Sequence, residues 1–441
     1  MTRIKHIAIL ISLSILSFTA ASQLTVGNEF RFAFMRNLNP AFNNPPSYEL
    51  SITALEDVDV DITFGVPENI DLGLPYEQQS ISIAAGQLVS VPFGSGIFYQ
   101  ETPGSAQQLS FHVVSTGDIQ ITAYHNRWFF SEATSVTPNI WLGSEYMVLT
   151  KMDGGEWSQA TIVATEDQTE MTITPSVDID ESPAGVPFNL TLNAGEVYTL
   201  AGLQSDLTGT TIESLAPIAV FAGANQTLVG NCGASSHLYE QLPPYEYWGD
   251  LFAFVPYAEK NGDLIKFLAS FDGTEIYTDC DELFATLDAG ESIEIIYDTP
   301  ELFSSNFPVL MAQMVTGAEC GGFTGDPNLV FVPPVTEANG QVSIQMLEAL
   351  DDQDPLDPFN PVFPTYWVNA VMLTDQTNLF TINGNAPETT WTPYDANPAL
   401  SYTTIEVPSF TNLLEIEAQG APFQINAYGL SQYDAYTWWP G

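Results

Sequence analysis

Short apolar runs separated by Gly, Pro and Asp extend along the chain from residue 30, and many alternate with polar residues in steps of two. In Thr172-Ile173-Thr174, for example, a strand would turn Ile173 to a core and its neighbours to solvent. The 31 Gly and 30 Pro residues supply turns between runs that are too short for helices. The pattern therefore predicts an all-β protein.

A strand, a turn containing Asp and a second strand recur four times. An Asp side chain accepts hydrogen bonds from the backbone two residues on and tolerates the left-handed conformation of a hairpin turn. We therefore expect a hairpin at each copy. The copies occupy 50–64, 161–175, 267–279 and 371–383, and their turn aspartates are Asp57, Asp167, Asp272 and Asp375.

Further elements recur with the same spacing and complete a β module of about 100 residues. A turn with Ala-Gly precedes a strand at 85–86, 194–195 and 289–290, but the fourth copy lacks it. We expect an aromatic strand to open each unit, the last of them at 329–332, and a closing strand to end it. The predicted modules span 23–137, 138–245, 246–325 and 326–441.

No Gly/Ser-rich or Pro-rich linker separates the modules, so we expect them to pack together rather than to form beads on a string. Radial repetition hides strand edges efficiently, and this favours a closed, propeller-like arrangement. Tandem β-sandwiches are the alternative, because a module of this length is long for a propeller blade.

The first residues have the layout of a secretory signal peptide. Arg3 and Lys5 precede an apolar run over 7–21 that ends in small residues. We expect 1–22 to be removed and the mature protein to be secreted, extracellular or at the cell surface. No other apolar run approaches membrane length, so no transmembrane helix is expected in the mature chain.

The composition is strongly acidic, with 54 Asp and Glu against 8 Lys and Arg and a formal net charge of −46. Such a surface repels phosphate backbones and lacks the basic clusters that bind them, which excludes nucleic acid as a partner. With 45% hydrophobic residues, the chain is too apolar for the disordered acidic class. The charge instead favours cationic partners or calcium.

Residues with catalytic or transition-metal chemistry form no recognisable constellation. His112, His125 and His237 share no metal-ligand spacing with each other or with a Cys, so no zinc or copper site is expected. His112 lies on an apolar strand and is expected to be structural. The chain has no nucleophile elbow, phosphate loop or dinucleotide fingerprint, and we expect a protein that is not an enzyme.

Acidic clusters are the candidate metal ligands. A solvated acidic face is the alternative interpretation of each cluster, and carboxylates that alternate along a strand at 57–61 are held too regularly to wrap an ion. Closely spaced carboxylates in a loop supply the oxygens that Ca²⁺ requires. The best calcium candidate is therefore a Pro-rich loop with Asp351, Asp352, Asp354 and Asp357.

Three cysteines, Cys232, Cys280 and Cys320, allow at most one intramolecular disulfide in an oxidising compartment. Cys280 and Cys320 fall in the same predicted module, whereas Cys232 lies in the crossing between the second and third modules. We therefore expect the pair Cys280 and Cys320.

The segment 232–256 resembles the hallmark of the IgGFc-binding protein N-terminal domain family, and similar segments lie at 142–146, 163–175 and 427–441. The matching hallmark positions are Cys232, His237, Leu238, Glu240, Gln241, Leu242, Pro243, Pro244, Trp248 and Gly249. The resemblance covers 23–441 as one β region of four repeats. It implies a secreted or cell-surface binding or adhesion module whose ligand is a glycoprotein, mucus or matrix component.

Two alternatives stay open beside this resemblance. The hallmark residues can be structural, because Pro243 and Pro244 would fix an extended crossing between modules with Trp248 in the core. The whole protein can instead be a structural matrix or surface-layer component that self-associates through calcium-bridged acidic contacts.

Overall fold

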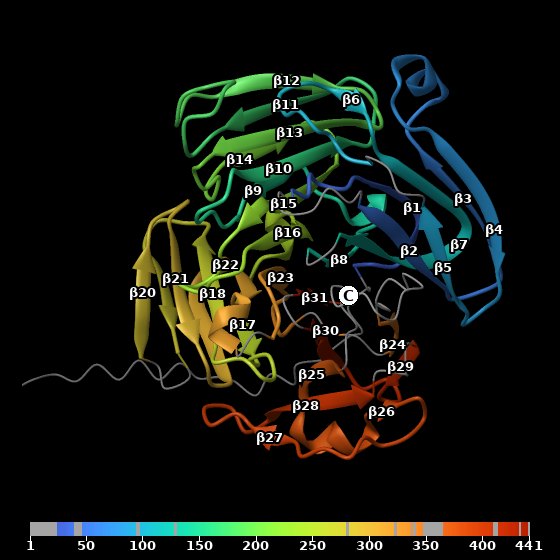
Figure 1. Cartoon of the computed structure of the whole chain (residues 1–441). Coiled ribbons are helices and arrows are strands. Elements are labelled where there is room, and N and C mark those ends of the chain that lie inside the picture. Colours follow the sequence, from blue (N-terminus) through green and yellow to red (C-terminus); the bar gives the residue numbers. More distant parts are fainter. Residues whose placement is uncertain are drawn as a thin grey trace, which may run out of the picture.

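The computed structural model describes residues 24–38, 46–93, 98–127, 130–278, 282–321, 324–336, 338, 341–346, 365–408, 413–431 and 434–439. These residues form β-strands joined by turns and a few short 3₁₀ helices (Figure 1). The all-β class and the four tandem β modules predicted from the repeats are confirmed.

Module 1 is a seven-stranded antiparallel sheet built around the long strand β7 (Phe111–Asn126). β3 and β2 flank β7, β4 and β5 continue the sheet outward, and β1 and β8 also pair with β7. The remaining bounds are β1 (Gly27–Phe32), β2 (Ser47–Ala54), β3 (Val58–Phe64), η1 (Pro67–Leu72), β4 (Glu77–Ile83), β5 (Leu88–Phe93), β6 (Gln107–Gln108) and β8 (Glu132–Ser135).

Module 2 consists of two antiparallel sheets. One has the order β16-β15-β10-β13-β6 and therefore borrows β6 from module 1, and the other has the order β12-β11-β14-β9. The bounds are η2 (Asn139–Trp141), β9 (Glu145–Met147), β10 (Trp157–Ala164), β11 (Thr169–Thr174), β12 (Phe188–Leu192), β13 (Glu196–Leu203), β14 (Thr211–Ser214), β15 (Ile218–Thr227) and β16 (Ser236–Gln241).

Module 3 repeats the plan of module 1. Its sheet has the order β20-β19-β22-β18-β21, and β17 and β23 also pair with the long strand β22. The bounds are η3 (Tyr245–Tyr247), β17 (Gly249–Phe254), β18 (Asp263–Ala269), β19 (Thr274–Tyr277), β20 (Leu283–Leu287), β21 (Ser292–Tyr297), β22 (Glu301–Val315), η4 (Ala318–Gly321) and β23 (Asn328–Val332).

Module 4 has two antiparallel sheets, of orders β24-β29-β26 and β27-β28-β25-β30-β31. The bounds are β24 (Gln341–Gln345), β25 (Thr365–Leu373), η5 (Thr374–Leu379), β26 (Thr381–Ile382), β27 (Thr392–Pro393), β28 (Leu400–Pro408), β29 (Leu413–Glu417), β30 (Phe423–Ser431) and β31 (Asp434–Trp438).

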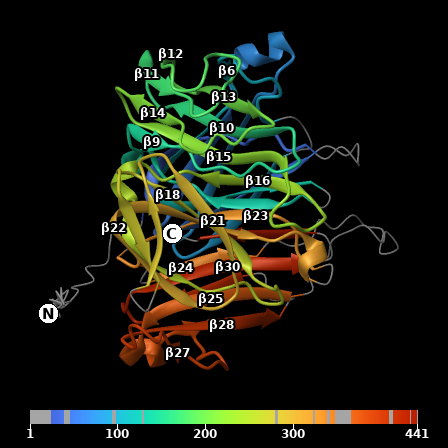
Figure 2. The ribbon, with the colours of Figure 1, turned by 90° about the vertical axis from the view of Figure 1, so that its left-hand side faces the viewer.

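The four modules close into a ring around their innermost strands. β8 contacts β16, β16 contacts β23, β23 contacts β31, and β31 contacts β8 again, and Figure 1 shows these strands at the centre with one module on each side. Seen from the side, the strands of module 3 lie in front, with module 2 above them and module 4 below (Figure 2). The propeller-like closed arrangement thus prevails over tandem sandwiches.

Hydrophobic cores are shared between neighbouring modules, which explains why the ring closes. The core of module 1 includes Val163 and Phe221 of module 2, and the core of module 2 includes Leu264 and Met314 of module 3. Cores of the same mixed kind join module 3 to module 4 and module 4 to module 1. Separating the modules would expose these apolar side chains to water.

The predicted hairpins are wrong, because the two strands of each repeat do not pair with each other. In modules 1 and 3 the long central strand lies between them, and in module 2 they belong to different sheets. The turn aspartates instead reach across to the Ala-Gly turn. The N–H groups of Ala85, Ala194 and Ala289 donate to Oδ1 of Asp57, Asp167 and Asp272 over 2.9, 3.1 and 3.0 Å, respectively.

Two further details differ from the repeat analysis. Asp375 lies in η5, in the copy that lacks the Ala-Gly turn. The strand at 329–332, expected to open the fourth module, is β23 and pairs with β22 of module 3. Its place in the sequence alone could not separate a closing strand from an opening one.

Candidate functional site

The inner strands carry polar side chains into the centre of the ring. One such residue comes from each module: Glu132 on β8, Glu240 on β16, Asn328 on β23 and Asp434 on β31. All four are buried, with between 0% and 6% of their surface exposed. Every position of β8, β16 and β31 other than Ser135 is buried, so these strands lack the alternation of a strand with one solvated face.

Side-chain hydrogen bonds join the modules at this centre. Asn328 Nδ2 donates to Glu132 Oε2 over 2.5 Å and approaches the carbonyl oxygens of Ser131 and Ala435 at 3.3 and 3.4 Å. The hydroxyl of Ser131 donates to Asp434 Oδ2 over 2.8 Å, and its N–H donates to Asp434 Oδ1 over 3.2 Å. These contacts connect modules 1, 3 and 4.

A matching pair of bonds connects modules 1 and 2. The N–H of Gln241 donates to Thr134 Oγ1 over 3.1 Å, and the N–H of Thr137 donates to Gln241 Oε1 over 2.8 Å. Because the inner strands of different modules form no common hydrogen-bonded ladder, such side-chain bonds supply the polar contacts between them.

Burial sets the protonation of the central carboxyl groups. It raises the pKa of Glu132 well above its ordinary value, and the charges of Glu240 and Asp434 raise it further, whereas the bond from Asn328 lowers it. Burial also raises the pKa of Glu240 well above its ordinary value and that of Asp434 to about 7. Ionisation is therefore unfavourable in this centre.

Two histidines that lie far apart in the sequence meet beside this centre. The rings of His125 on β7 and His237 on β16 are 5.2 Å apart and nearly perpendicular, and Tyr48 stacks on His125 at 4.7 Å. His237 Nδ1 lies 2.9 Å from the carbonyl oxygen of Ala224 and must carry the proton of that bond. Burial lowers the pKa of both histidines, in His237 to about 3, so both rings are neutral.

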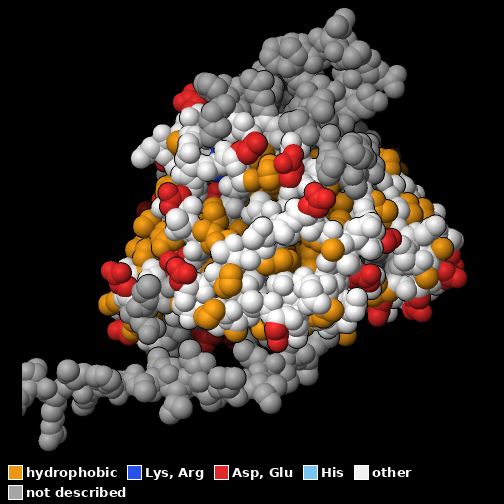
Figure 3. Space-filling model, turned by 90° about the horizontal axis from the view of Figure 1, so that it is seen from below, with side chains coloured by type: hydrophobic (Ala, Val, Ile, Leu, Met, Phe, Trp, Pro, Cys, Tyr) orange, Lys and Arg blue, Asp and Glu red, His pale blue; other side chains and the backbone are white. Residues whose placement is uncertain are grey.

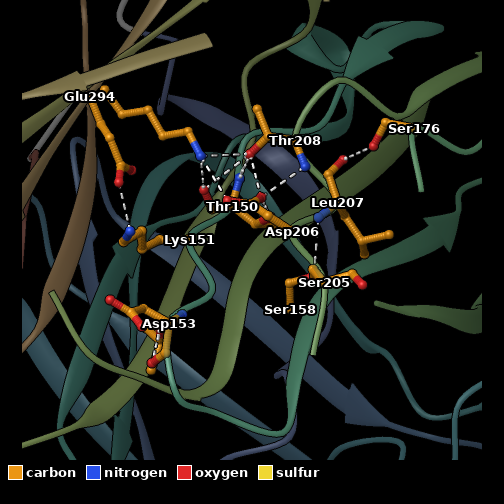
Figure 4. Close-up of polar contacts among 12 residues, drawn as sticks. Thr150, Lys151, Asp153, Ser158, Ser176, Ser205, Asp206, Leu207, Thr208 and Glu294 are labelled. Carbon is orange, nitrogen blue, oxygen red and sulfur yellow. Dashed lines mark hydrogen bonds and ion pairs between the residues drawn. The ribbon is translucent and has the colours of Figure 1, made fainter. Parts of the chain in front are cut away.

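The boundary between modules 2 and 3, which we call the 2/3 seam, contains a buried lysine. Lys266 on β18 donates from Nζ to Asp206 Oδ2 over 2.8 Å, and to Thr150 O and Thr208 Oγ1 over 3.0 Å each. Asp206 lies between Thr150 and Thr208, whose hydroxyls each donate to its Oδ1 over 2.6 Å (Figure 4). Burial favours a raised pKa of Asp206, but Lys266 and the two threonines lower it.

A second ion pair lies nearby on the 2/3 seam. Lys151 Nζ donates to Glu294 Oε1 over 2.8 Å (Figure 4). Both side chains line a cavity of about 190 Å³ together with Asp153 and Asn231. Ligand pockets usually enclose about 300–1,000 Å³, so this hollow is too small for a typical ligand.

The outer sheet of module 2 carries a larger groove of about 610 Å³. A row of residues in register crosses it from strand to strand: Glu145 on β9, Glu213 on β14, Thr172 on β11 and Asn189 on β12. Glu145 and Glu213 stand directly opposite each other, a pairing that like charges disfavour. Leu215 beside them is 83% exposed, so we call this groove, lined by Glu145, Thr172, Asn189, Glu213 and Leu215, the acidic groove.

A protein family profile described as IgGFc binding protein matches residues 132–429, well over half of the chain. The chain belongs to this IgGFc-binding protein family. No curated protein sequence matches it. Within the described part of the chain, no helix is long and apolar enough to cross a membrane.

The hallmark residues of the IgGFc-binding family lie in the frame of the ring. His237, Glu240 and Gln241 are buried on β16, at the centre. Trp248 is buried in the crossing to module 3, packs on Tyr245 at 4.7 Å, and donates from Nε1 to Pro243 O over 3.3 Å. This placement agrees with a structural role for the hallmark.

Two hallmark residues, Pro244 and Gly249, each make a close Gly–Pro contact within their module. A Cβ atom added to Gly143 would lie 2.4 Å from Pro244 Cβ, and one added to Gly249 would lie 2.3 Å from Pro334 Cβ. In both contacts a Gly at the start of a module faces a Pro that follows the inner strand of the same module. This chain thus requires Gly at these two positions, because a Cβ atom would clash with the facing Pro ring.

The disulfide of this IgGFc-binding chain joins Cys232 to Cys320, with the Cα atoms 5.4 Å apart. The predicted bond between Cys280 and Cys320 is therefore wrong, and Cys280 lies outside the described residues. Cys232 follows β15 in module 2 and Cys320 lies in η4 of module 3, so the bond crosses the 2/3 seam. Assigning cysteines to modules failed because adjacent modules touch there.

The other predicted site residues have different outcomes. Asp351, Asp352, Asp354 and Asp357 lie outside the described residues, so calcium binding by that loop stays a prediction. Among the residues that the structure describes, no group of three or more His, Cys, Asp or Glu side chains converges as metal ligands. His112 Nε2 lies 2.9 Å from Glu29 Oε1, a partly exposed pair on the sheet of module 1.

Proposed function

We propose that this member of the IgGFc-binding family is a secreted, non-enzymatic binding or adhesion protein that attaches to cationic sites on a glycoprotein or matrix component. The observation that carries the proposal is the position of the cations. Lys151 and Lys266 are paired within the 2/3 seam, and Lys260 donates to Thr324 O over 2.8 Å. Arg36 lies over the ring of Trp157, 4.2 Å from its centroid, and Arg127 donates to Asn37 O over 2.6 Å.

The sixth cation after residue 22, Arg31, is half-buried beside the charges of Glu29 and Asp167, so the outer surface is mostly acidic. On the face seen in Figure 3, acidic side chains are spread between hydrophobic ones, with hardly any basic atoms visible. Such a surface attracts cationic partners and raises their rate of encounter. The acidic groove is the docking site that we favour, since it combines the opposed Glu145 and Glu213 with the exposed Leu215.

The arrangement of the polar groups supports binding rather than catalysis. Burial raises the pKa of Glu132, Glu240 and Asp434, but these carboxyl groups are buried in the ring and do not line the acidic groove. The family description names the Fc part of IgG, which is a glycoprotein, and purified Fc is therefore one ligand worth testing.

The experiment is a binding assay with the mature chain on immobilised matrix glycoproteins, mucus extract and Fc. We expect saturable binding that high salt weakens, because exposed charges are screened within about 10 Å at 0.1 M salt. The E145Q/E213Q variant should bind more weakly. The matched control is E415Q/E417Q, which removes the same charge from exposed positions on β29 of module 4.

Binding that is insensitive to salt, or lost equally in both variants, would contradict a role for the acidic groove. Turnover of a glycan substrate that one carboxylate substitution abolishes would contradict the non-enzymatic assignment.

A further inference from the structure

Four equivalent strands, one in each module, lie at the edge of a sheet or one strand away from it. They are β5, β13, β21 and β28, which pair with β2, β10, β18 and β25, respectively. The two-residue strand β6 covers the outer side of β13, and β27 covers that of β28. In module 1, β5 is uncovered but carries Pro92. Of the four, only β21 has neither a proline nor a covering strand within the described part of the chain.

The strand β21 is also unusually exposed. None of its residues is buried, whereas six of the eight residues of β13 are. Ile295 and Ile296 are 37% and 44% exposed, and Figure 2 shows β21 at the front of module 3. An uncovered edge strand offers unpaired N–H and C=O groups to another chain, and proteins usually protect such edges with a Pro or a covering segment. A further strand can therefore reach β21.

The Ala-Gly turn fixes which backbone groups of β21 point to the open side. Gly290 N–H donates to Ala269 O, and Ala269 N–H donates to Glu291 O, over 3.0 Å each. In an antiparallel ladder, bonded pairs recur at every second residue. Every second residue after Glu291 therefore bonds to β18. Glu294 and Ile296 lie between these residues and turn their N–H and C=O groups to the open side.

Module 2 shows how such an edge is covered. By its spacing from the Ala-Gly turn, Thr199 of β13 takes the place of Glu294. Thr199 N–H donates to Gln100 Oε1 over 2.7 Å, and its carbonyl oxygen accepts a hydrogen bond from Gly104 N–H over 3.1 Å. Both partners belong to the segment 98–108 of module 1, which also contains β6. An extended segment thus satisfies on β13 the backbone groups that β21 leaves open.

The connection of module 2 that corresponds to this covering segment is shorter. It spans 204–210 and brings Asp206 to the ion pair of the 2/3 seam, but it forms no strand on β21. The cavity of about 190 Å³ lies beside the open edge, and Asn231, Glu294 and Ile296 are among its lining residues. The 2/3 seam therefore retains a hollow next to β21, whereas module 1 covers β13.

We propose that β21 binds an extended cationic segment of a partner protein, which adds to its open edge as a further strand. In strand addition, backbone hydrogen bonds supply affinity and alternate side chains supply specificity. Glu294 and Ile296 lie two residues apart and therefore on one face of the sheet. A basic residue opposite Glu294 and an apolar residue opposite Ile296 complement them.

Charge favours this partner over a second copy of the chain. Glu291 and Asp298 flank β21, and Asp153 lines the cavity; all three are exposed and form no ion pair with any residue that the structure describes. Lys151 is buried and pairs with Glu294. A second copy has the same net charge of −46 and is repelled, whereas a cationic segment is attracted. The proposal does not depend on the acidic groove, which lies on the outer sheet of module 2.

The test uses the mature chain and a fluorescent peptide with blocked ends, Thr-Lys-Thr-Val-Thr-Lys-Thr-Val-Thr. Its basic and apolar residues are two positions apart on one face. We expect saturable binding by fluorescence anisotropy, and slower amide hydrogen exchange of Glu294 and Ile296 in the complex. The same peptide N-methylated at its Lys and Val residues cannot donate hydrogen bonds to β21 and should not bind.

The I296P variant copies the protection found in module 1. Pro92 lies six positions after the Gly of its Ala-Gly turn, as Ile296 does. The substitution removes one outward N–H but no bond to β18, so the fold should persist. We expect peptide affinity to fall at least about tenfold. I296A keeps the N–H and should weaken binding less than I296P does.

The E294K variant tests the proposal even if I296P does not fold. It reverses the charge of a side chain that faces the added strand. The variant should therefore bind a peptide with Glu in place of Lys more tightly than the original peptide, the reverse of the wild-type preference.

Equal peptide affinity of the wild type and I296P would overturn the proposal. Binding that is lost in E145Q/E213Q but kept in I296P would place the peptide in the acidic groove and overturn it as well. Slow exchange of the Glu294 and Ile296 amides without peptide would show that the chain covers its own edge. Wild-type self-association that I296P abolishes would assign the edge to a second copy, against the cationic partner.

Discussion

The 2/3 seam and the centre of the ring, which we call the ring axis, both bury acidic side chains between modules. They differ in how these acids are neutralised. Both bury charged groups between modules, but the seam pairs Asp206 with Lys266, whereas the axis brings Glu132, Glu240 and Asp434 together without a cation. The pKa of Asp206 is consequently lowered, and those of the axial acids are raised. With six Lys and Arg after residue 22, the chain has too few cations to pair both regions.

The comparison shows what a cation-poor composition does to a fold. The 2/3 seam is held by an ion pair and a disulfide, so its strength depends on charge and redox state. The stability of the ring axis depends on hydrogen bonds between uncharged groups and on the neutralisation of its carboxyl groups. The predictions below begin with the largest expected effect.

Removing the disulfide should cost the most, because it closes a long loop across the 2/3 seam. The two cysteines are 88 residues apart, and a loop of this length corresponds to about 4.5 kcal/mol in the chain-entropy description. We expect C232S/C320S to lower the free energy of unfolding by about that amount in urea titrations.

The C280S variant is the matched control and should change stability by less than about 0.5 kcal/mol. Peptide mapping of the wild type should recover Cys232 linked to Cys320. A large loss in C280S would restore the pairing that we rejected.

Replacing Lys266 with Met should cost slightly less. The carboxyl group of Asp206 would stay between modules without its cation, and breaking a buried pair typically costs about 3–5 kcal/mol. Because 30% of the Asp206 side chain is exposed, we expect the lower end, about 3 kcal/mol, from urea unfolding.

E294Q removes the acid of the neighbouring and more exposed pair, so it should cost less than about 1 kcal/mol. Equal losses in the free energy of unfolding for K266M and E294Q would contradict the expectation that the buried ion pair stabilises the 2/3 seam more than the exposed one.

Acid should strengthen the axis and weaken the 2/3 seam. Asp434 has a pKa of about 7 in the folded state against 3.8 ordinarily, so the folded protein binds its proton more tightly. Its contribution to stability is therefore greatest below pH 3.8 and is lost as the pH rises to 7. Asp206 has a lowered pKa, and its contribution is present above pH 3.8 and is lost as the pH falls below that value.

Other groups also make stability depend on pH. The neutral His125 and His237, for example, favour the folded state less as the pH falls below 6.5. Comparing the wild type with single variants isolates the contributions of Asp434 and Asp206. Between pH 8 and pH 4 in EDTA, the wild type should gain on the order of 2 kcal/mol relative to D434N. Relative to D206N it should lose stability only below pH 3.8. If the free energies of unfolding of D434N and D206N changed in parallel with pH, the ring axis and the 2/3 seam would not respond to acid in opposite directions.

The sequence predicts the fold well because the fold is a repeat. The recurring strand and Asp turn at Asp57, Asp167 and Asp272 indicates modules, and each of these aspartates has a backbone partner. The partner is a distant Ala N–H rather than the next residues of the turn. A local rule for Asp turns cannot find it, since the contact depends on how the long central strand separates its neighbours.

The ring axis was largely hidden from sequence reasoning. Glu132 and Asp434 lie in short polar segments that are typical of exposed strands, and nothing in their spacing shows that three other modules cover them. Glu240 was identified only through the resemblance to the IgGFc-binding family. His125 and His237 have no metal-ligand spacing, yet closure of the ring brings their rings within 5.2 Å. Contacts made by ring closure depend on the tertiary arrangement and leave no periodic pattern.

The acidic groove provides the smallest effect and a third case, in which like charges face each other in solvent. Glu145 opposes Glu213 across β9 and β14, and such a pair costs roughly 0.2–1 kcal/mol. We expect E145Q/E213Q to raise the free energy of unfolding by a few tenths of a kcal/mol at low salt. Because water and salt screen exposed charges, the gain should vanish in 1 M NaCl, where the screening length is about 3 Å. Replacing the buried Glu240 with Gln should raise the free energy of unfolding by an amount that survives the same salt, since dissolved ions screen buried charges much less. A groove whose gain persists in salt would show that its glutamates are held by local packing, and would weaken the case that their charges are available to a partner.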